Sequence, residues 1–390
     1  MNIGIFSDTY YPQINGVATS IRMLEREFNR MGHRVYIFTT SDPHAPQALP
    51  RVFRLPSMPF VFLPTHRVAY MYSPKLLMKL KSLDLDIVHT QTEFPVGIFG
   101  KVVSEFLHIP MVHTYHTMYE DYVHYIARGH LVTPKMAQQF SRMFCNRARA
   151  VIAPVGKTRA SLLQYGVVRP ISVIPTGIDF SPFNPARYPK EDILALRASY
   201  GIAPDDPVVV TVGRVAKEKS MDVLVREWPK LAARLPRAKF VIVGDGPVRT
   251  ELTTLAGSLG VSDSVIFTGA QPWDNIGRFY QLGDVFTMAS TSETQGLTYV
   301  EAIASHLPVV VKSDPSVAGL IAHGETGYCF HKDEEASDLL YHVLTHPAEA
   351  KIIAENGWQA IQHLSSEHFA KNVETLYLDV LQNKLNRKLS

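Results

Sequence analysis

Short runs of β-branched and other apolar residues recur along the whole chain, and segments with helical spacing separate them. This alternation is typical of parallel α/β units, because neighbouring parallel strands need a crossover connection, which is usually a helix. We therefore predict two doubly wound parallel sheets, one in each half of the chain. The predicted strands are 2–6, 35–39, 87–90, 111–114, 150–153 and 172–174 in the first half, and 208–212, 240–243, 265–268, 285–288 and 308–311 in the second.

Length and proline content indicate where the chain divides. A chain of 390 residues is too long for one typical core and fits two domains of roughly 150–200 residues. Six prolines fall between residues 175 and 207, too many for helix interiors or central strands, so the break lies there. We assign residues 1–185 to an N-terminal domain and 186–365 to a C-terminal domain, and we expect residues 366–390 to form a helix that crosses back to the first domain.

Cysteine content and hydropathy indicate the cellular compartment in which the protein is expected. The two cysteines, Cys145 and Cys329, lie far apart without metal-ligand spacing, which argues against a disulfide scaffold or structural zinc and fits a reducing compartment. Residues 1–8 lack the basic start and long apolar core of a signal peptide. Because no run of about 18 uncharged apolar residues occurs, we expect a cytoplasmic protein without a transmembrane helix.

Charge is distributed unevenly between the two halves. Residues 1–180 hold 19 basic and 11 acidic residues, a net charge of +8, whereas the remaining 20 basic and 25 acidic residues give −5. A basic half favours an anionic partner, either nucleic acid or phospholipid headgroups. Ordinary variation between two domains is the alternative.

Basic side chains follow the first strand of the second half. Arg214 and Lys219 stand five residues apart, where a guanidinium fork and an ammonium can together hold two phosphates. The next strand leads into a Gly-Asp-Gly-Pro turn at 244–247, in which Gly244 permits close approach of the backbone to a ligand. Arg249 replaces the third glycine of a dinucleotide fingerprint, which disfavours an NAD-dependent oxidoreductase. Either segment can also be an ordinary surface loop.

The segment 289–301 carries the strongest functional signal. Small polar residues and Gly296 end a strand, and a helix is predicted to begin there, so its free amides and positive dipole end can bind a diphosphate. Glu293 precedes the helix, and Glu301 lies about a turn and a half into it. Each carboxylate can accept hydrogen bonds from vicinal hydroxyls of a sugar. Alternatively, Glu293 is a helix cap and Glu301 a surface residue.

The spacing Glu293-x7-Glu301, with Gly296 between the glutamates, resembles the retaining glycosyltransferases of family 4. The basic pair Arg214 and Lys219 stands upstream as it does in that family, and the resemblance covers nearly the whole chain. It implies the GT-B fold, in which two Rossmann-like domains face a cleft. Many members have Phe-Gly where this chain has Gln-Gly at 295–296, and because the glycine is kept we expect the phosphate cradle to be kept.

The resemblance also implies roles for individual residues. Arg214 and Lys219 would hold the donor diphosphate, Glu301 would bind the nucleotide ribose, and Glu293 would contact the transferred sugar. It implies neither a cofactor nor an obligatory metal, since the sugar nucleotide is a substrate. The expected donor-binding residues are Gly16, Arg214, Lys219, Gly244, Gly296, Leu297 and Glu301. The expected catalytic residues are His116, Glu293, Arg214 and Lys219.

Polar residues also follow two strands of the N-terminal half. Gly16 lies in a loop that opens a helix and matches a family residue that reaches the donor phosphates. His113 and His116 are three residues apart, but no third zinc ligand has suitable local spacing. The resemblance favours His116 as the histidine that contacts the sugar, with His113 as the second choice. Glu120 and Asp121 are candidates for orienting the acceptor or handling its proton.

Two stretches, 54–81 and 134–149, mix apolar and basic residues as an element at a membrane interface does. An amphipathic helix packed on its own sheet is the alternative for either stretch alone. The runs 89–94, 113–122 and 292–299 resemble Gram-positive diacylglycerol glucosyltransferases, which build the glycolipid anchor of lipoteichoic acid. This implies transfer of glucose or galactose from a UDP-hexose to diacylglycerol or monoglucosyl-diacylglycerol, by a peripheral protein on the inner face of the plasma membrane.

Functions of other classes fit parts of the same sequence pattern. A UDP-sugar epimerase with the GT-B fold would share the donor site, and another family 4 transferase would differ in its acceptor. A nucleic-acid-binding module would use the basic half, but the aromatic residues there form no evident base-stacking platform, and the phosphate-binding motifs lie in the acidic half. We therefore expect a UDP-hexose donor, a lipid acceptor and an anionic membrane surface as partners, without nucleic acid. The oligomeric state stays open.

Overall fold

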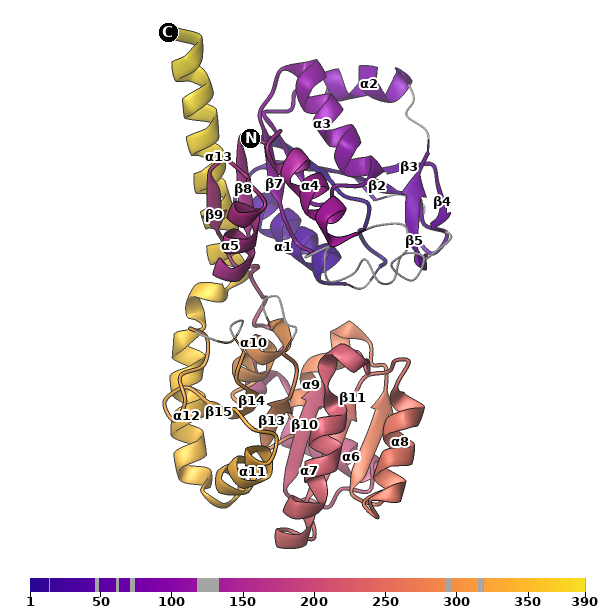
Figure 1. Ribbon diagram of the computed structural model, residues 1–390, viewed down its shortest axis with the longest axis vertical. Helices are drawn as coiled ribbons and strands as arrows, with labels where there is room; N and C mark the ends of the chain where they lie inside the picture. The colour runs from indigo at the N-terminus through magenta and orange to yellow at the C-terminus, as the bar shows by residue number, and fades with distance from the viewer. Residues whose placement is uncertain are drawn as a thin grey trace. The chain divides into compact units, whose positions relative to one another are not determined.

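The computed structural model describes residues 1–13, 15–45, 49–60, 63–70, 74–117, 133–291, 296–314, 317 and 319–389. The chain forms two compact units (Figure 1). The first unit consists of Met1–Gly177 together with Ser366–Ser390, and the second is Ile178–Ser365. The first unit is therefore completed by residues from the far end of the chain.

In its described part, the first unit contains a seven-stranded parallel sheet in the order β3-β2-β1-β6-β7-β8-β9. The order reverses between β1 and β6, and ligands of doubly wound sheets bind beyond the carboxyl ends of the strands at such a point. The strands are β1 Asn2–Phe6, β2 Arg34–Thr40, β3 Val52–Leu55, β6 Ile87–Thr90, β7 Met111–Thr114, β8 Ala150–Ala153 and β9 Ile171–Val173.

The sequence pattern did not predict β3 or the antiparallel pair of β4, Ser57–Phe60, and β5, Leu63–Ala69. These strands lie in or beside the stretch 54–81, and the prolines at 56, 59 and 64 interrupt the pattern that a strand normally shows. Arg67 ties the pair together, because its guanidinium donates to the carbonyl oxygen of Ser57 at 2.7 Å.

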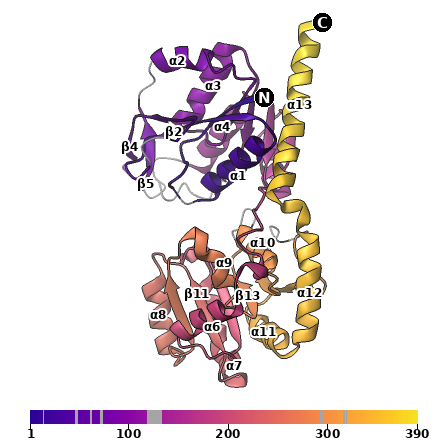
Figure 2. The same cartoon turned by 180° about the vertical axis from the view of Figure 1, so that it is seen from behind.

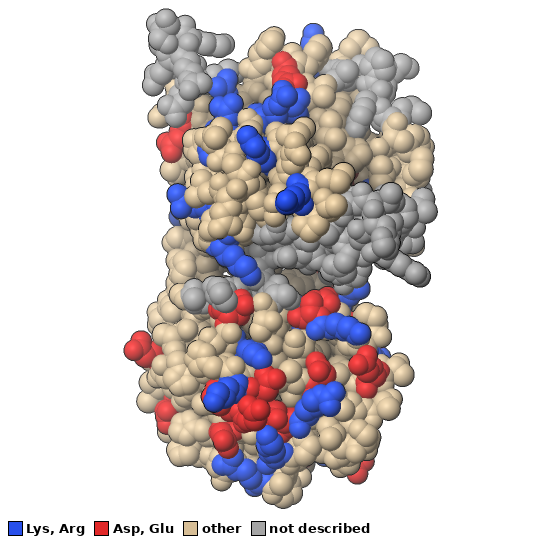
Figure 3. All heavy atoms as spheres, viewed as in Figure 1, with Lys and Arg blue, Asp and Glu red and all other residues tan. Residues whose placement is uncertain are grey.

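Helices cover both faces of this sheet. On one face α1, Gly16–Arg30, and α13, Ser366–Leu389, share a buried apolar cluster (Figure 2). On the other face α2 to α5 bury apolar residues against the same strands. Figure 3 shows the side of the first unit on which α3 and α4 lie. Most atoms on this side are uncharged, and lysine and arginine side chains are scattered among them. These helices are α2 Pro74–Lys81, α3 Pro95–Leu107, α4 Pro134–Cys145 and α5 Gly156–Gln164.

The described part of the second unit contains a six-stranded parallel sheet in the order β12-β11-β10-β13-β14-β15. Its order reverses between β10 and β13. The strands are β10 Val208–Val212, β11 Lys239–Val243, β12 Val265–Gly269, β13 Val285–Met288, β14 Val309–Lys312 and β15 Tyr328–Phe330. The helices are α6 Lys190–Ser199, α7 Met221–Arg234, α8 Arg249–Ser258, α9 Ile276–Tyr280, α10 Leu297–Ala304, α11 Glu335–Thr345 and α12 Pro347–Ala360.

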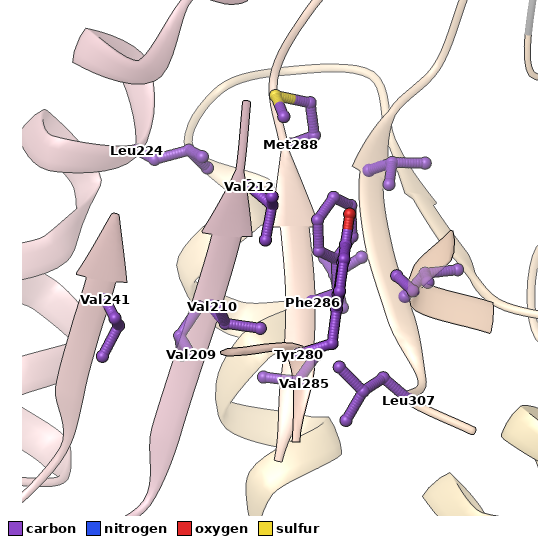
Figure 4. Close-up of a cluster of buried hydrophobic side chains, with 14 of the residues drawn as sticks. Val209, Val210, Val212, Leu224, Val241, Tyr280, Val285, Phe286, Met288 and Leu307 are labelled. Atoms are coloured by element: carbon purple, nitrogen blue, oxygen red, sulfur yellow. The ribbon is translucent and has the colours of Figure 1, made fainter. Parts of the chain in front are cut away.

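The core of the second unit explains why its strands are apolar throughout. Helices cover both faces of the sheet, so side chains on both faces of β10 are buried, including Val209 and Val210 (Figure 4). Phe286 of β13 packs beside Tyr280 of α9, with ring centroids 6.0 Å apart. The predicted pair of doubly wound sheets is confirmed, with β15 as an edge strand that the sequence pattern missed.

Candidate functional site

The basic pair of the second unit lies at the point where its strand order reverses. Arg214 follows β10 and is exposed, and Lys219 ends the short 3-10 helix Lys217–Lys219. The Ser290 hydroxyl, just after β13, donates to the carbonyl oxygen of Glu218 at 3.0 Å. This bond ties the loop that carries Lys219 to the end of the neighbouring strand, which is where a doubly wound sheet binds ligands.

The backbone of Gly213 lies so close to Gly244 that only glycine fits at this position. Its φ is 144°, and a Cβ added there would lie 1.9 Å from the carbonyl oxygen of Gly213. The Gly213 amide in turn donates to the carbonyl oxygen of Val243 at 2.9 Å. Glycine is therefore required for the crossing of two loops at the end of the sheet, and this structural role is sufficient to explain the residue.

Helix α10 begins one residue after Gly296, close to the predicted start. Gly296 has a φ of 66°, and an added Cβ would lie 2.4 Å from Cδ2 of Tyr299. This left-handed turn directs the chain from β13 into the helix, whose first residue is Leu297. Glu293 lies outside the described residues. The amides at the start of α10 are thus held at the same sheet edge as Lys219.

Glu301 is buried, with 6 % of its surface exposed. The Tyr280 hydroxyl donates to its Oε2 atom at 2.6 Å, and Figure 4 shows that hydroxyl directed toward the carboxyl ends of the strands. Burial raises the pKa of Glu301 to about 7, while the Tyr280 bond and the positive charge of Lys219 act to lower it. The structure thus brings Glu301 and Lys219 together, and the alternative of a surface glutamate is wrong.

Tyr280 is a residue that the sequence analysis missed. It lies 21 positions before Glu301, on α9, and no local spacing links the two. Its pKa is raised well above the ordinary value by burial and by the adjacent carboxylate, so the hydroxyl keeps its proton and remains a donor. One carboxylate oxygen of Glu301 is thereby engaged, and the other can accept a hydrogen bond from a ligand.

Gly16 is the first residue of α1 in the first unit and is exposed. The side chain of Asn15 caps this helix by accepting from the Ala18 amide at 2.9 Å. A Cβ added at Gly16 would meet no atom within 4 Å. Packing within the unit therefore does not require glycine at this position.

His116 follows β7 and belongs to a chain of polar side chains. Its Nε2 atom lies 2.6 Å from Oε1 of Gln91, an acceptor, and Nε2 of Gln91 lies 3.1 Å from Nε2 of His89. His89 in turn meets the hydroxyl of Tyr377 on α13 at 2.5 Å. Burial, with a smaller effect of His113, lowers the pKa of His116 to about 3. The ring is therefore neutral at physiological pH, and its Nδ1 atom can accept a hydrogen bond.

The surroundings of His113 favour a structural role for this side chain. It is fully buried, with Nε2 3.0 Å from Oε1 of Glu93 and Nδ1 2.9 Å from the hydroxyl of Thr90. These contacts engage both ring nitrogens, so His113 is less suited than His116 to contact a ligand. Glu120 and Asp121 lie outside the described residues. No group of three or more His, Cys, Asp or Glu side chains in the described parts of the chain is arranged to hold a metal ion.

Two Rossmann-like units with polar residues at the carboxyl ends of their sheets are the architecture of GT-B glycosyltransferases, and the comparisons with known proteins identify the chain as one of them. Residues 14–181 match the model described as Glycosyltransferase Family 4, and residues 192–360 match Glycosyl transferases group 1. The chain belongs to this glycosyltransferase family, and it is an enzyme of that class.

The chain is similar over its full length to two proteins named alpha-monoglucosyldiacylglycerol synthase. The one from Streptococcus pneumoniae is 37% identical over 392 residues, which span 100% of this chain and 88% of the relative. The one from Acholeplasma laidlawii is 35% identical over 402 residues and 100% of both chains. This degree of similarity extends across both units.

Solved structures share the fold. An Anabaena protein, HepE, in complex with UDP and glucose superposes with a TM-score of 0.75 at 19% identity, over 96% of this chain and 99% of that one. Sucrose-phosphate synthase from Thermosynechococcus elongatus gives a TM-score of 0.73 at 21% identity, over 98% and 99%. Within the part of the chain that the structure describes, no helix has the length and apolar character needed to cross a bilayer.

Proposed function

We propose that this enzyme transfers glucose from UDP-glucose, with retention of the anomeric configuration, to 1,2-diacylglycerol or a monoglycosyl-diacylglycerol. The observation that carries the proposal is similarity over the full chain, at 37% and 35% identity, to two proteins named as synthases of such a glycolipid. The product would be a membrane glycolipid of the kind that anchors lipoteichoic acid. Galactose in place of glucose is an outcome that the experiment below distinguishes.

In this proposal the second unit is the donor domain and binds UDP-glucose. Arg214, Lys219 and the amides at Gly296 and Leu297 hold the diphosphate, close to the turn at Gly244. Such groups act most strongly when negative charge develops on the leaving diphosphate, so electrostatic stabilisation supplies much of the rate enhancement. The bond between Ser290 and Glu218 holds the loop of Lys219 at the end of β13, and the charge of Lys219 acts on Glu301 of α10; both observations support the assignment.

Glu301 and Glu293 hold the two sugars of the donor in this proposal. The Oε1 atom of Glu301 accepts from a ribose hydroxyl, because Tyr280 already donates to Oε2. Glu293 contacts the hexose. Among the described residues Tyr280 donates to Oε2, which leaves Oε1 to accept from a hydroxyl ligand and supports the assignment.

The proposed chemistry is a same-face displacement at the anomeric carbon. The bond between this carbon and the diphosphate oxygen breaks as the bond to the acceptor oxygen forms, and the acceptor proton passes to the departing diphosphate. Neutral His116 accepts a hydrogen bond from a hexose hydroxyl, since its low pKa keeps Nδ1 unprotonated. Gly16 provides an amide for the phosphates, and Glu120 and Asp121 orient the acceptor.

The first unit is the acceptor domain in this proposal, and it meets the membrane. The net charge of +8 over residues 1–180, nearly all of which belong to this unit, favours contact with anionic lipid, and the acceptor itself is a lipid. In the stretch 134–149 the residues Met136 and Met143 are 54 % and 59 % exposed, which supports an interfacial location. We propose a peripheral enzyme on the inner face of the plasma membrane.

The test is to incubate the purified full chain with UDP-glucose or UDP-galactose and liposomes that contain diacylglycerol or monoglucosyl-diacylglycerol. Mass spectrometry identifies new lipids, and the anomeric linkage is read by nuclear magnetic resonance. We expect an α-hexosylated lipid from one of the two acceptors. Intact donor with both lipids would reject the lipid acceptor, and release of an isomeric UDP-sugar without lipid product would indicate an epimerase.

A further inference from the structure

Helix α3 has two apolar faces. One face is buried against the sheet and carries Val96, Phe99 and Val103. A helix at the surface normally has charged or polar residues on its other face, but here that face is also apolar. Four large side chains, spaced four residues apart, begin at the helix N-cap and follow this outer face. They are Phe94, Ile98, Val102 and Phe106, which are 46 %, 43 %, 45 % and 48 % exposed.

The neighbouring helix α4 repeats this arrangement. Its exposed apolar residues are Met136, Phe140 and Met143, and Phe140 is 38 % exposed. The helices lie side by side, since a Cβ added at Gly97 of α3 would be 3.6 Å from Cζ of Phe144 of α4. Both helices cover the same face of the sheet (Figure 1). We call these seven side chains, together with the basic residues described next, the α3/α4 surface.

Positive charge accompanies the apolar side chains. The ammonium of Lys81 lies 4.9 Å from the ring centre of Phe106, and Lys101 pairs with Glu105 at 3.0 Å. Figure 3 shows basic side chains more often than acidic ones on this side of the first unit. The basic residues on α4 and directly after it are Lys135, Arg142 and Arg147, all exposed.

The charge decides which partner fits the α3/α4 surface. In a two-fold dimer a self-complementary patch faces its own copy, so the lysines and arginines of the two chains would be brought together and would repel one another. An anionic lipid surface is complementary instead, because apolar side chains enter the acyl boundary while long basic side chains reach the phosphates. The observations therefore favour a bilayer over a second copy.

We propose that the α3/α4 surface docks the first unit on bilayers that contain anionic phospholipid. The apolar residues of both helices are inserted at the boundary between headgroups and acyl chains, and the basic residues contact headgroup phosphates. The inference deepens the proposed function and rests on it for its biological meaning, since an enzyme with a lipid acceptor must meet the membrane. Helix α3 lies in neither of the stretches, 54–81 and 134–149, from which membrane contact was expected.

The first test replaces Ile98, Val102 and Met143 with glutamine in one full-length variant. Glutamine is a good helix former and carries no charge, and the three positions are exposed, so the fold should be kept. Binding is measured by flotation with phosphatidylcholine vesicles, with and without phosphatidylglycerol, in the absence of UDP-glucose. We expect the apparent affinity for phosphatidylglycerol vesicles to fall about tenfold or more, because half-exposed apolar surface no longer leaves water.

The matched control is the double variant Leu378→Gln and Ile352→Gln. These residues are 45 % and 63 % exposed, but Leu378 lies on α13, which covers the opposite face of the sheet, and Ile352 lies on α12 of the second unit. We expect native vesicle binding from this control and unchanged unfolding temperatures for both variants.

A separate charge variant, Arg142→Gln with Arg147→Gln, tests the basic residues. Phosphatidylglycerol should increase its vesicle binding much less than it increases that of the native chain, and its binding should depend less on salt.

Native vesicle binding by the triple variant would overturn the proposal. So would a native dimer that the triple substitution converts to monomers without any change in vesicle binding, because the surface would then join two copies. The binding assay contains no donor, so its outcome is independent of catalysis. A chain that binds vesicles through this surface but transfers no hexose would reject the proposed function and leave the docking surface standing.

Discussion

Glu301 is almost completely buried in the second unit, yet a carboxylate must be ionised to accept hydrogen bonds from two sides. Burial raises its pKa to about 7, and the Tyr280 hydroxyl and Lys219 oppose this rise. Tyr280 also fixes the carboxylate by its 2.6 Å bond to Oε2. Both the orientation and the charge of Glu301 therefore depend on its neighbours.

We predict that Tyr280→Phe raises the KM for UDP-glucose about tenfold and changes kcat much less. The reason is that a hydrogen bond to a charged group is lost while the chemical step is untouched. Steady-state kinetics separate the two constants. Tyr328→Phe is the control, since the Tyr328 hydroxyl also donates to a glutamate, Glu349, at 2.7 Å. An unchanged KM in Tyr280→Phe would remove this residue from the donor site.

The same arrangement predicts a pH dependence. Ionised Glu301 is needed for donor binding, so kcat/KM should be high above pH 7 and should decline as pH falls through the pKa of about 7. Because the Tyr280 bond lowers this pKa, Tyr280→Phe should move the decline to higher pH, and Glu301→Gln should abolish it. For stability the sign is opposite, since a raised carboxyl pKa disfavours folding increasingly as pH rises from 4.5 to about 7. A decline at the same pH in native enzyme and Tyr280→Phe would contradict the assignment.

For Lys219 we predict that substitution by alanine lowers kcat about 100- to 1,000-fold, because a preorganised positive charge near the leaving group is lost. Lys217→Ala is the matched control on the same 3-10 helix, and Lys217 is exposed. Initial rates at saturating UDP-glucose provide the measurement. Equal rates for the two variants would show that Lys219 does not act in the reaction.

Some residues of the candidate site could be located from the sequence, and others could not. Arg214 and Lys219 follow a strand and Glu301 lies in the first half of a helix, all within short motifs, so their positions in those motifs placed them near one sheet edge. Tyr280 and Gln91 act through contacts between separate elements, and such contacts leave no local pattern. In the chain of hydrogen-bonded side chains from Tyr377 to His116, the two partners His89 and Tyr377 are 288 positions apart in sequence, and only the folded structure brings them together.

At the scale of elements, the turn from β13 into α10 depends on Gly296. We predict that Gly296→Ala lowers stability by about 1–3 kcal/mol, because the left-handed backbone disfavours alanine and the new Cβ meets Tyr299. UDP affinity should fall as well, since the amides of α10 are displaced. Thermal unfolding and calorimetric titration with UDP measure the two effects.

Gly324→Ala separates the two causes. Gly324 also has a left-handed φ, 78°, but an added Cβ would meet nothing within 4 Å. This control should therefore show the cost of the backbone conformation alone and native affinity for UDP. Equal UDP affinity in both variants would mean that the start of α10 does not bind the diphosphate.

Most elements could be predicted because their apolar pattern is simple. Six of the predicted strands coincide with β1, β6, β7, β8, β10 and β13 residue for residue within the described chain. Strands β3, β4 and β5 were missed, since Arg54 and the prolines give them a mixed pattern typical of loops. Gly32, which follows α1, has a φ of 84°, a left-handed conformation in which glycine is favoured after a helix.

At the scale of the whole molecule, the first unit is built from two segments that are far apart in sequence. Residues of α13 enter the same buried cluster as Ile21, Leu24 and Phe28 of α1. Phe369, Val373 and Tyr377 of α13 are 4 %, 0 % and 0 % exposed. The sequence led us to expect a helix that crosses back to the first domain, but only the folded chain shows the cluster to which its buried residues belong.

We therefore predict that a chain ending at Ser365 loses the first unit while the second remains folded. Fully burying each of Phe369, Val373 and Tyr377 contributes about 1.5–3 kcal/mol, and the sum of roughly 5–9 kcal/mol is comparable with the whole stability of a domain. Calorimetry should show that one of two unfolding transitions disappears, and limited proteolysis should leave a fragment of the second unit. A chain ending at Gln382 keeps those three residues and should retain both transitions. Two intact transitions in the shorter chain would show that α13 is dispensable, whereas loss of one would show that the first unit cannot fold until the last helix has been made.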